Sequence, residues 1–456
     1  MRLSLRNFGP IREVDLVVKP LTILIGPNSA GKSYVLRLLW SLLSLEPDFR
    51  GLVEIARRNL EAQKELSPAF HSFLEEITLN PTPMFSNLEN YLKEVFEIQE
   101  IGELVRAGED RCEIRILGEE GAEIRFEIKE GKLIFEVCGE EKIKEEIRKF
   151  VVVEVPSHIK KESADLILLK EEIQRAETIP AGAEKIEEVA RFFVSNIPYV
   201  WEDLFEYVPA SAAFLLPDGR AGIIHVREIL VESVFTGWQP SKMNPIVKEY
   251  LKLLETLKPF ERREVSHLWE LLERGLEAQF ELLRRPPYFE VRDRRRGLTY
   301  PLQAAPSGFR EVGPLILLLK YADLKGHYLL VEEPEAHLHP DAQSLIVRAL
   351  AGLTEYCPVL FTTHSIHVLD EIDNLLRLKL LPPEKKREEE YEEWEGLEPE
   401  EVAIYFFSKE GEVEVVSLSE EGIDKETGLD RIAREIANRH ARVFEHFEIK
   451  RAREKA

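Results

Sequence analysis

The chain has 456 residues, enough for two or three lobes around a large hydrophobic core. No apolar run approaches the roughly 18–20 residues of a membrane span, and the N-terminus reads as an early strand rather than a signal peptide. We therefore expect a cytoplasmic protein that is not bound to a membrane. The three cysteines lack paired spacing, which argues for reduced thiols and against disulfides or a metal site. A formal net charge of −23 opposes nucleic-acid binding except through a local basic face.

The N-terminal segment reads as three strands. Arg2–Asn7 and Glu13–Val18 are expected to pair as an antiparallel hairpin. Residues 21–25 are an apolar run that leads directly into Gly-x-x-x-x-Gly-Lys-Ser at 26–33, and a helical pattern begins at Tyr34. A strand before this spacing and a helix after it are the context of a phosphate-binding P-loop.

The residues of this loop have separate roles in holding a polyphosphate. Gly26 and Gly31 let the backbone turn tightly, so that successive N–H groups point inward. Lys32 supplies a cation for the β- and γ-phosphates, and the Ser33 hydroxyl is placed to bind Mg²⁺. The sequence therefore predicts a site for ATP and Mg²⁺, formed by Gly26, Pro27, Asn28, Ser29, Ala30, Gly31, Lys32 and Ser33.

The next part of the chain alternates between helical and extended patterns. Residues 50–105 read as mostly helical, with breaks at Pro81 and Pro83, and residues 140–200 are again helical. Between them, three runs of alternating polarity are separated by glycine-containing turns and predict an antiparallel meander: Cys112–Leu117, Glu123–Ile128 and Lys132–Cys138.

Residues 214–300 read as an inserted lobe of amphipathic helices, such as Ile246–Leu257 and Val265–Leu283. No heptads are sustained, so no long coiled coil is expected. The lobe ends in a basic cluster formed by Arg284, Arg285, Arg292, Arg294, Arg295 and Arg296, and the tail from Arg439 to Lys455 is also basic. We interpret both as solvated surface, with a nucleic-acid face as the alternative. The opposite charge gathers in Glu388–Glu401, which we expect to be an exposed acidic loop.

The C-terminal third carries three further polar clusters, each joined to an apolar element. Ala-Pro-Ser-Gly-Phe-Arg at 305–310 precedes an apolar helix over Val312–Leu324. There Ser307 can cap the helix, and Gly308 lets a phosphate approach the exposed N–H groups.

Two of these clusters end apolar strands. The run Tyr328–Val331 reads as a buried parallel strand, and Glu332 and Glu333 follow at its C-terminal end, where ligands bind in open α/β sheets. Glu332 would hold Mg²⁺ directly or through water, and Glu333 would polarise the attacking water. The next strand, at 359–363, ends in His364, whose ring could hydrogen-bond the γ-phosphate or hold that water.

The order of these motifs resembles the ABC-class ATPases. It is similar above all to their soluble branch, which includes RecF, the SMC-like repair ATPases, and the ATPase modules of OLD-family nucleases and related phage-defence ATPases. The opening Leu-Arg-Asn-Phe-Gly-Pro-Ile at 5–11 fits that branch too. The resemblance covers residues 1–45 and 300–370, and 403–422 more loosely. It implies an α/β P-loop NTPase of ABC-ATPase type, with a mixed sheet, an antiparallel β-subdomain that contains the meander, and an inserted helical lobe.

The resemblance also implies residue roles. Lys32 and Ser33 take the phosphate and Mg²⁺ positions, Glu332 takes the Mg²⁺ carboxylate position, Glu333 is the catalytic base and His364 is the switch histidine. Ser307 and Gly308 fall on the signature, which in the family contacts the γ-phosphate held by the opposite protomer. Ala336–His339 fall on the D-loop, which lies along the dimer seam.

Three features depart from the family pattern. Phe309 and Arg310 replace the second glycine and the glutamine of the transporter signature, and Arg310 is a candidate in-trans cation. The first Walker B acid is Glu332 rather than aspartate, which fits the OLD-like branch. No Q-loop glutamine stands out; the best candidate position is a strand at Phe205–Val208 followed by Pro209-Ala210-Ser211.

These observations predict an ATPase lobe in two parts, 1–213 and 301–422, with the inserted lobe at 214–300 and a helical tail at 423–456, which would leave no room for a nuclease domain. We expect an ATP-switched, head-to-tail dimer, or a higher oligomer built from it, that regulates or scaffolds a separate effector protein, as in anti-phage defence. The alternative is a DNA-repair or DNA-processing ATPase of RecF or SMC-like type that acts on DNA itself. The arginine cluster distinguishes these two functions: if it lines a groove across the dimer, the DNA-processing alternative is favoured.

Overall fold

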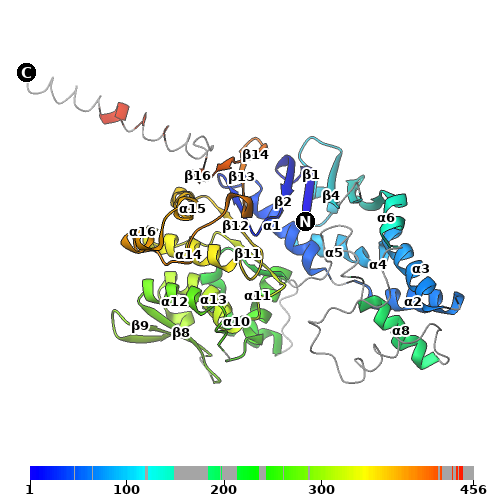
Figure 1. Cartoon of the computed structure of the whole chain (residues 1–456), viewed down its shortest axis with the longest axis horizontal. Helices are drawn as coiled ribbons and strands as arrows, with labels where there is room; N and C mark the ends of the chain where they lie inside the picture. The colour runs from blue at the N-terminus through cyan, green and yellow to red at the C-terminus, as the bar shows by residue number, and fades with distance from the viewer. Residues whose placement is uncertain are drawn as a thin grey trace, which may run out of the picture. The chain divides into compact units, whose positions relative to one another are not determined.

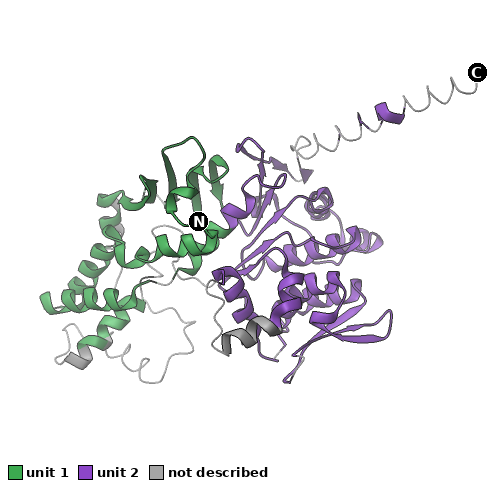
Figure 2. Cartoon of the chain, turned by 180° about the vertical axis from the view of Figure 1, so that it is seen from behind, with its two compact units in different colours: residues 1–17, 37–212 green, residues 18–36, 213–456 purple. Residues whose placement is uncertain are grey.

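The computed structural model describes residues 1–45, 47–63, 65–118, 122–147, 183–195, 197, 213–235, 243–259, 261–285, 288–419 and 422–423, together with 434, 438–439 and 441–444. The internal contacts divide the chain into two compact units (Figure 2). The first unit consists of Met1–Val17 and Arg37–Ala212, and the second of Val18–Leu36 and Ala213–Ala456. The contacts thus group residues 214–300 with the C-terminal motifs, whereas the four segments expected from the sequence remain a prediction.

The first unit contains a five-stranded antiparallel sheet in the order β2-β1-β4-β5-β6. The N-terminal hairpin and the meander, both confirmed, join in this sheet because β1 pairs with β4 along its length. The strand bounds are β1 Arg2–Phe8, β2 Ile11–Val17, β4 Arg111–Leu117, β5 Glu123–Lys129 and β6 Lys132–Cys138.

The other elements described in the first unit are helices. Their bounds are α2 Phe49–Ala62, α3 Leu66–Leu79, α4 Thr82–Phe85, α5 Leu88–Phe96, α6 Glu140–Ile147 and α8 Ala183–Ser195, with a short 3-10 turn η1 at Ile101–Leu104. The break expected at Pro81 is present, because α3 ends before it and α4 begins after it. The break expected at Pro83 is wrong, because Pro83 lies in the first turn of α4, where the missing N–H of proline costs no helical hydrogen bond. Phe193 of α8 packs on Phe70 and Phe73 of α3, with ring centroids 4.9 and 5.7 Å apart.

The second unit is built on a six-stranded sheet in the order β14-β13-β3-β12-β11-β7, of which β11 to β14 are labelled in Figure 1. The five strands from β13 to β7 are parallel, and β14 is an antiparallel edge. Every residue of β3, β12 and β13 is buried, as expected of parallel strands covered on both faces. The bounds are β3 Leu21–Ile25, β7 Ala213–Leu216, β11 Tyr328–Glu332, β12 Val359–Thr363, β13 Val402–Phe407 and β14 Val413–Val415.

The helices α12, α13, α14 and α15 of this unit pack in a series, α13 on α12, α12 on α14 and α14 on α15 (Figure 1). The helix α1, Lys32–Ser44, begins in this unit and belongs to the first unit from Arg37 onward. The other helix bounds are α10 Arg220–Phe235, α11 Pro245–Thr256, α12 Ser266–Gly275, α13 Ser307–Tyr321, α14 Pro340–Leu353, α15 Ile366–Leu378 and α16 Pro383–Glu388. Short 3-10 turns lie at η3 Leu302–Ala304 and η4 Pro399–Glu401, and Leu418–Ser419 (β15) pairs with Gly422–Ile423 (β16).

The helix expected over Val265–Leu283 is wrong in its second half. The helix α12 ends at Gly275, and residues Ala278–Leu282 form strand β8. This strand pairs with β9 (Phe289–Asp293), which pairs with β10 (Leu298–Pro301) in a three-stranded antiparallel sheet. A positive φ of 49° at Glu277 reverses the chain, and alternate burial of Ala278 and Phe280 favours a strand over continued helix.

The acidic loop is also less exposed than expected. Glu395 is 1% exposed and forms a bidentate ion pair with Arg348 of α14, with distances of 2.6 and 2.8 Å. Leu397 is buried beside it, so this part of the segment packs on the unit instead of extending into solvent. Charge counting along the sequence missed the pair because its partner lies 47 residues away.

Three further expectations concern the cysteine thiols, membrane-spanning helices and segments that lie outside the described residues. Cys112, Cys138 and Cys357 are free in the structure. Within the described ranges, no helix has the length and apolar character needed to cross a bilayer. The proposed Q-loop segment at 205–211 lies outside the described residues, as do much of 140–200 and most of the basic tail.

Candidate nucleotide site

The predicted site motifs meet at one edge of the sheet of the second unit. Strand β12 lies between β3, which leads into the P-loop, and β11, which carries the two glutamates. In the parallel register, Thr363 is opposite Ile25 and Thr362 is opposite Glu332. The P-loop, the Glu332–Glu333 pair and His364 therefore all follow the carboxyl ends of adjacent strands, where ligands bind in open α/β sheets.

The P-loop is shaped by a close approach of backbones at Gly26. This residue has a φ of 151°, and a Cβ atom built on it would lie 2.3 Å from the carbonyl oxygen of Phe407, at the end of β13. No side chain fits there. Ser29 and Gly31 also have positive φ, 63° and 101°, so the loop turns repeatedly before α1 begins at Lys32. This is the backbone shape in which successive N–H groups can face an anion.

Lys32 is the buried cation of this loop. Its side chain donates hydrogen bonds from Nζ to the carbonyl oxygens of Gly26 and Pro27, at 2.8 and 2.9 Å. Burial lowers the pKa of Lys32, and the nearby carboxylates of Glu333 and Glu335 oppose that shift. The ammonium group is thus held over the loop by groups that a phosphate oxygen can replace. Ser33 follows it in the first turn of α1 and is partly exposed.

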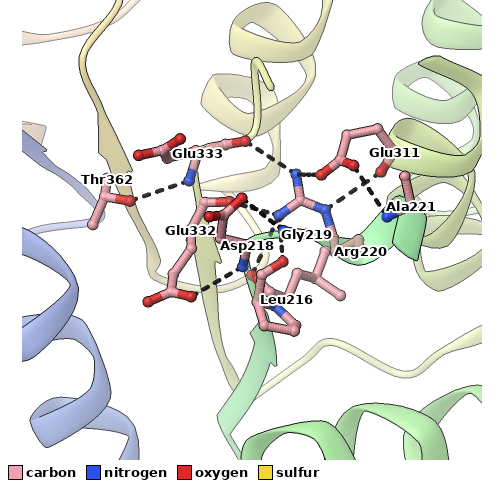
Figure 3. A network of polar contacts seen from close by, with 10 residues as sticks. Leu216, Asp218, Gly219, Arg220, Ala221, Glu311, Glu332, Glu333 and Thr362 are labelled. Atoms are coloured by element: carbon pink, nitrogen blue, oxygen red, sulfur yellow. Dashed lines mark hydrogen bonds and ion pairs between the residues drawn. The ribbon is translucent and has the colours of Figure 1, made fainter. Parts of the chain in front are cut away.

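Glu332 is a fully buried carboxylate at the end of β11, with 0% exposure. Its Oε2 accepts a hydrogen bond from the backbone N–H of Asp218, which follows β7, at 3.0 Å (Figure 3). The predicted metal donors, the Ser33 hydroxyl and the Glu332 carboxylate, are hard oxygen ligands of the kind that Mg²⁺ takes beside substrate phosphates. The donor chemistry therefore fits Mg²⁺.

Glu333 occupies a constrained turn beside His364. Its φ is 44°, unusual for a residue with a side chain, and its N–H donates to both the carbonyl and the hydroxyl oxygen of Thr362 at 3.1 Å (Figure 3). Its Oε1 lies 3.3 Å from Nδ1 of His364. Both side chains are partly exposed, 24% for Glu333 and 44% for His364, so solvent reaches them. The structure brings the predicted base and the predicted switch histidine into contact.

Glu335 is a site residue that the sequence analysis missed. It is 3% exposed, and its Oε1 accepts hydrogen bonds from the Thr363 hydroxyl and from the N–H of His364. Its other oxygen has no hydrogen-bond partner among the described residues, and burial raises the pKa of this carboxyl group. The available signal was the third acid in Glu-Glu-Pro-Glu, placed just after a buried strand.

The signature segment differs in detail from the expectation. Pro306 is the N-cap of α13, and Ser307 is its exposed first residue, so Ser307 does not cap the helix as predicted. A Cβ atom on Gly308 would lie 3.6 Å from Leu338 and 3.7 Å from the His337 carbonyl oxygen. The predicted signature and D-loop segments are therefore neighbours. Arg310 donates to the Ala221 carbonyl oxygen at 3.4 Å, so the structure directs this candidate in-trans cation toward α10.

Comparison with known proteins finds a family whose model matches most of the chain. The model of a family described as AAA ATPase domain matches residues 1–369. No curated protein matches the chain significantly.

Solved SMC head structures align with the chain at low similarity. An SmcHead bound to the C-winged helix domain of ScpA shares 13% identity, with 92% of this chain and 97% of that chain covered and a TM-score of 0.44. The SMC head domain from Thermotoga maritima shares 11% identity over 92% and 98%, with a TM-score of 0.37. An Smc head domain with an extended coiled coil, bound to the C-terminal domain of ScpA derived from Pyrococcus furiosus, shares 13% over 96% and 98%, with a TM-score of 0.40.

Proposed function

The chain belongs to the AAA ATPase domain family, and on that premise we propose that it is an ABC-type switch protein that binds and hydrolyses ATP. The observation that carries the proposal is the contact of Glu333 with His364 at the sheet edge that also carries the P-loop. A carboxylate beside a histidine can orient a water molecule and take its proton as the water attacks the γ-phosphate. Bound Mg²⁺, held by Ser33 and Glu332, would neutralise charge on the phosphates.

Lys32→Ala tests the nucleotide site. The substitution removes the buried ammonium group, and charge-assisted hydrogen bonds of this kind contribute about 1.5–3 kcal/mol, so ATP affinity should fall at least roughly tenfold. Isothermal titration with Mg²⁺ and ATP measures the loss. Lys409→Ala, in the exposed turn after β13, is the matched control and should bind ATP as wild type does. Unchanged affinity in Lys32→Ala would contradict the P-loop assignment.

We further propose that two copies close head to tail around two ATP molecules. The support is the first turn of α13, with Ser307 exposed and Gly308 partly exposed, and its neighbour, the predicted D-loop. These are the segments that the ABC class uses against the opposite protomer's nucleotide. A two-fold arrangement of this kind closes on itself and does not propagate. ATP then joins the two copies, and loss of the γ-phosphate releases them.

Ser307→Arg tests this closure. An arginine in the first turn of α13 fills the space that the partner's phosphate would occupy, so ATP should still bind while ATP-driven association is lost. Light scattering with and without ATP measures association, and small-angle scattering measures compaction if the protein is already oligomeric. Ser67→Arg, in the exposed first turn of α3, is the control. Closure of Ser307→Arg to the wild-type extent would exclude the head-to-tail contact proposed here.

We propose that the closed state regulates or scaffolds a separate effector protein, with DNA as the alternative partner. The net charge of −23 supports the first reading. The second draws on the arginine cluster, whose six side chains are exposed on and around the β9–β10 hairpin. Acidic residues interrupt that cluster, since Arg296 pairs with Asp293 at 3.3 Å and Arg295 approaches Glu277 at 3.9 Å.

Binding to plain duplex DNA should therefore be weak at about 0.15 M salt and should fall steeply as salt rises. Fluorescence anisotropy over a salt series measures both. The informative variant changes Arg292 and Arg294–Arg296 to glutamine, and a variant with Arg57 and Arg58 of α2 changed serves as the control. Nanomolar affinity that only the first variant loses would favour the DNA-processing alternative over the effector.

A further inference from the structure

Arg220 is a buried arginine to which the proposed nucleotide site assigns no role. It is the first residue of α10, only 2% exposed, and follows the turn Pro217-Asp218-Gly219 at the end of β7. Strand β7 pairs in parallel with β11, with Leu216 opposite Val331. The end of β7 therefore lies beside the end of β11, where Glu332 and Glu333 begin their turn.

The Arg220 guanidinium group donates to five backbone carbonyl oxygens (Figure 3). Its Nε donates to that of Glu311 at 3.4 Å, and its two Nη atoms donate to the other four. Nη1 of Arg220 donates to the carbonyl oxygen of Glu332 at 2.6 Å and to that of Pro217 at 2.9 Å, with Leu216 at 3.4 Å. Nη2 donates to the carbonyl oxygen of Glu333 at 3.1 Å. The planar guanidinium presents five donors in a fixed fork, an arrangement that a lysine ammonium group does not reproduce.

The turn that Arg220 holds is conformationally costly. Glu333 has a left-handed φ of 44°, and such a conformation persists only where its surroundings enforce it. Thr362 fixes the N–H of Glu333 from one side, and Arg220 fixes the carbonyl from the other. The direction of the proposed catalytic carboxylate therefore depends on Arg220.

The same guanidinium group is tied to the signature helix. Its Nη2 lies 2.7 Å from Oε1 of Glu311, and the other oxygen of Glu311 accepts the N–H of Ala221 at 3.1 Å. Glu311, labelled in Figure 3, is 1% exposed, and it follows Ser307 by one turn of α13. A fully buried ion pair stabilises a protein little compared with apolar packing of similar volume. Stability alone therefore does not account for this pair.

We propose that Arg220 is a positioning residue for Glu332 and Glu333, and that its pair with Glu311 couples the first turns of α13 to this site. A nucleotide of the opposite protomer that contacts Ser307–Gly308 then changes the rate of hydrolysis at the protomer's own Glu333. The inference rests on the proposed ATPase function and adds to it a path between the two nucleotides of the closed dimer. The path runs through the contacts of the Arg220 guanidinium group with Oε1 and with the backbone carbonyl oxygen of Glu311.

The test compares Arg220→Lys and Glu311→Gln with wild type in steady-state ATP hydrolysis. Both variants should lower kcat at least about tenfold and leave the ATP dissociation constant within about threefold. The dependence of rate on ATP should be cooperative in wild type and hyperbolic in both variants. Arg227→Lys is the matched control, because Arg227 is also buried on α10 but pairs with Glu255 away from the turn, and it should hydrolyse ATP as wild type does.

Two outcomes overturn the inference while the proposed function stands. One is wild-type kcat and cooperativity in both variants; the other is a change in ATP affinity alone. In either case wild type hydrolyses ATP and Glu333→Gln does not. If wild type itself fails to hydrolyse ATP, the proposed function and this inference fall together.

Hydrogen exchange covers the case in which both variants fail to fold. It is measured with ATP on Glu333→Gln, and on the same protein carrying Ser307→Arg. Protection of residues 217–223 should rise with ATP in the first protein and stay low in the second, although both bind ATP. Equal protection in the two proteins would overturn the coupling, because a blocked signature contact would then leave the Arg220 turn unaffected.

Discussion

Glu333→Gln should bind ATP normally and hydrolyse it at least about a hundredfold more slowly than wild type, because the amide keeps the size of the side chain but cannot accept the proton of the attacking water. The contact with His364, 3.3 Å away, is polar enough to survive the change, so the histidine should keep its place. Phosphate release under saturating ATP measures the effect. Glu355→Gln, on the exposed turn after α14, controls for loss of a negative charge in the same unit.

The same variant should accumulate in the ATP-closed state, since closure precedes hydrolysis in the proposed cycle. Scattering with ATP should then report more association or compaction for Glu333→Gln than for wild type. Combining it with Ser307→Arg should abolish this difference while ATP binding persists. Normal turnover by Glu333→Gln would show that another group activates the water, and the ABC-type mechanism would be wrong.

The strands and the site could be predicted where the signal is local. The P-loop, Glu332, Glu333 and His364 each follow an apolar run within a few residues, and parallel strands bring such C-terminal ends to one edge without further information. The N-terminal hairpin and the meander were equally accessible through their period of two. The pairing of β1 with β4, however, joins segments about a hundred residues apart, and the sequence of neither strand indicates it.

The parts that the sequence could not show depend on distant partners. Glycine is needed at position 26 because the Phe407 carbonyl oxygen lies close to it. The role proposed for Arg220 depends on its contacts with Glu311 and with the turn at Glu332. The helix predicted from the sequence ran on from α12 through the residues of β8. The apolar residues Ala278, Phe280 and Leu282 can be buried in a helix or in a strand, so they did not mark the change. Composition likewise made the acidic loop look solvated, whereas Arg348 draws one of its glutamates into the interior.

Glu395→Ala should therefore destabilise the protein far more than its place in an acidic loop suggests. The carboxylate is fully buried against Arg348 and also accepts the N–H of Glu392 at 2.6 Å, while the Arg348 guanidinium stacks 4.5 Å from the Tyr391 ring centre. Removing one partner of a buried pair leaves the other charge desolvated, at a cost of about 3–5 kcal/mol. Thermal unfolding should show a fall in Tm of at least about 6 °C, given roughly 2 °C per kcal/mol for a large domain.

Glu393→Ala is the control for that loss, because its carboxylate is 60% exposed and pairs only across the surface with Arg387, at 3.2 Å. Its Tm should stay within about 1 °C of wild type, as exposed ion pairs contribute little. Replacing Arg348 and Glu395 together with methionine should recover most of the stability that Glu395→Ala loses, since apolar residues of similar volume avoid the stranded charge. A double variant as unstable as Glu395→Ala would mean that the loop is held by the hydrogen bonds of the carboxylate, and a Glu395→Ala protein as stable as the control would place that carboxylate in solvent.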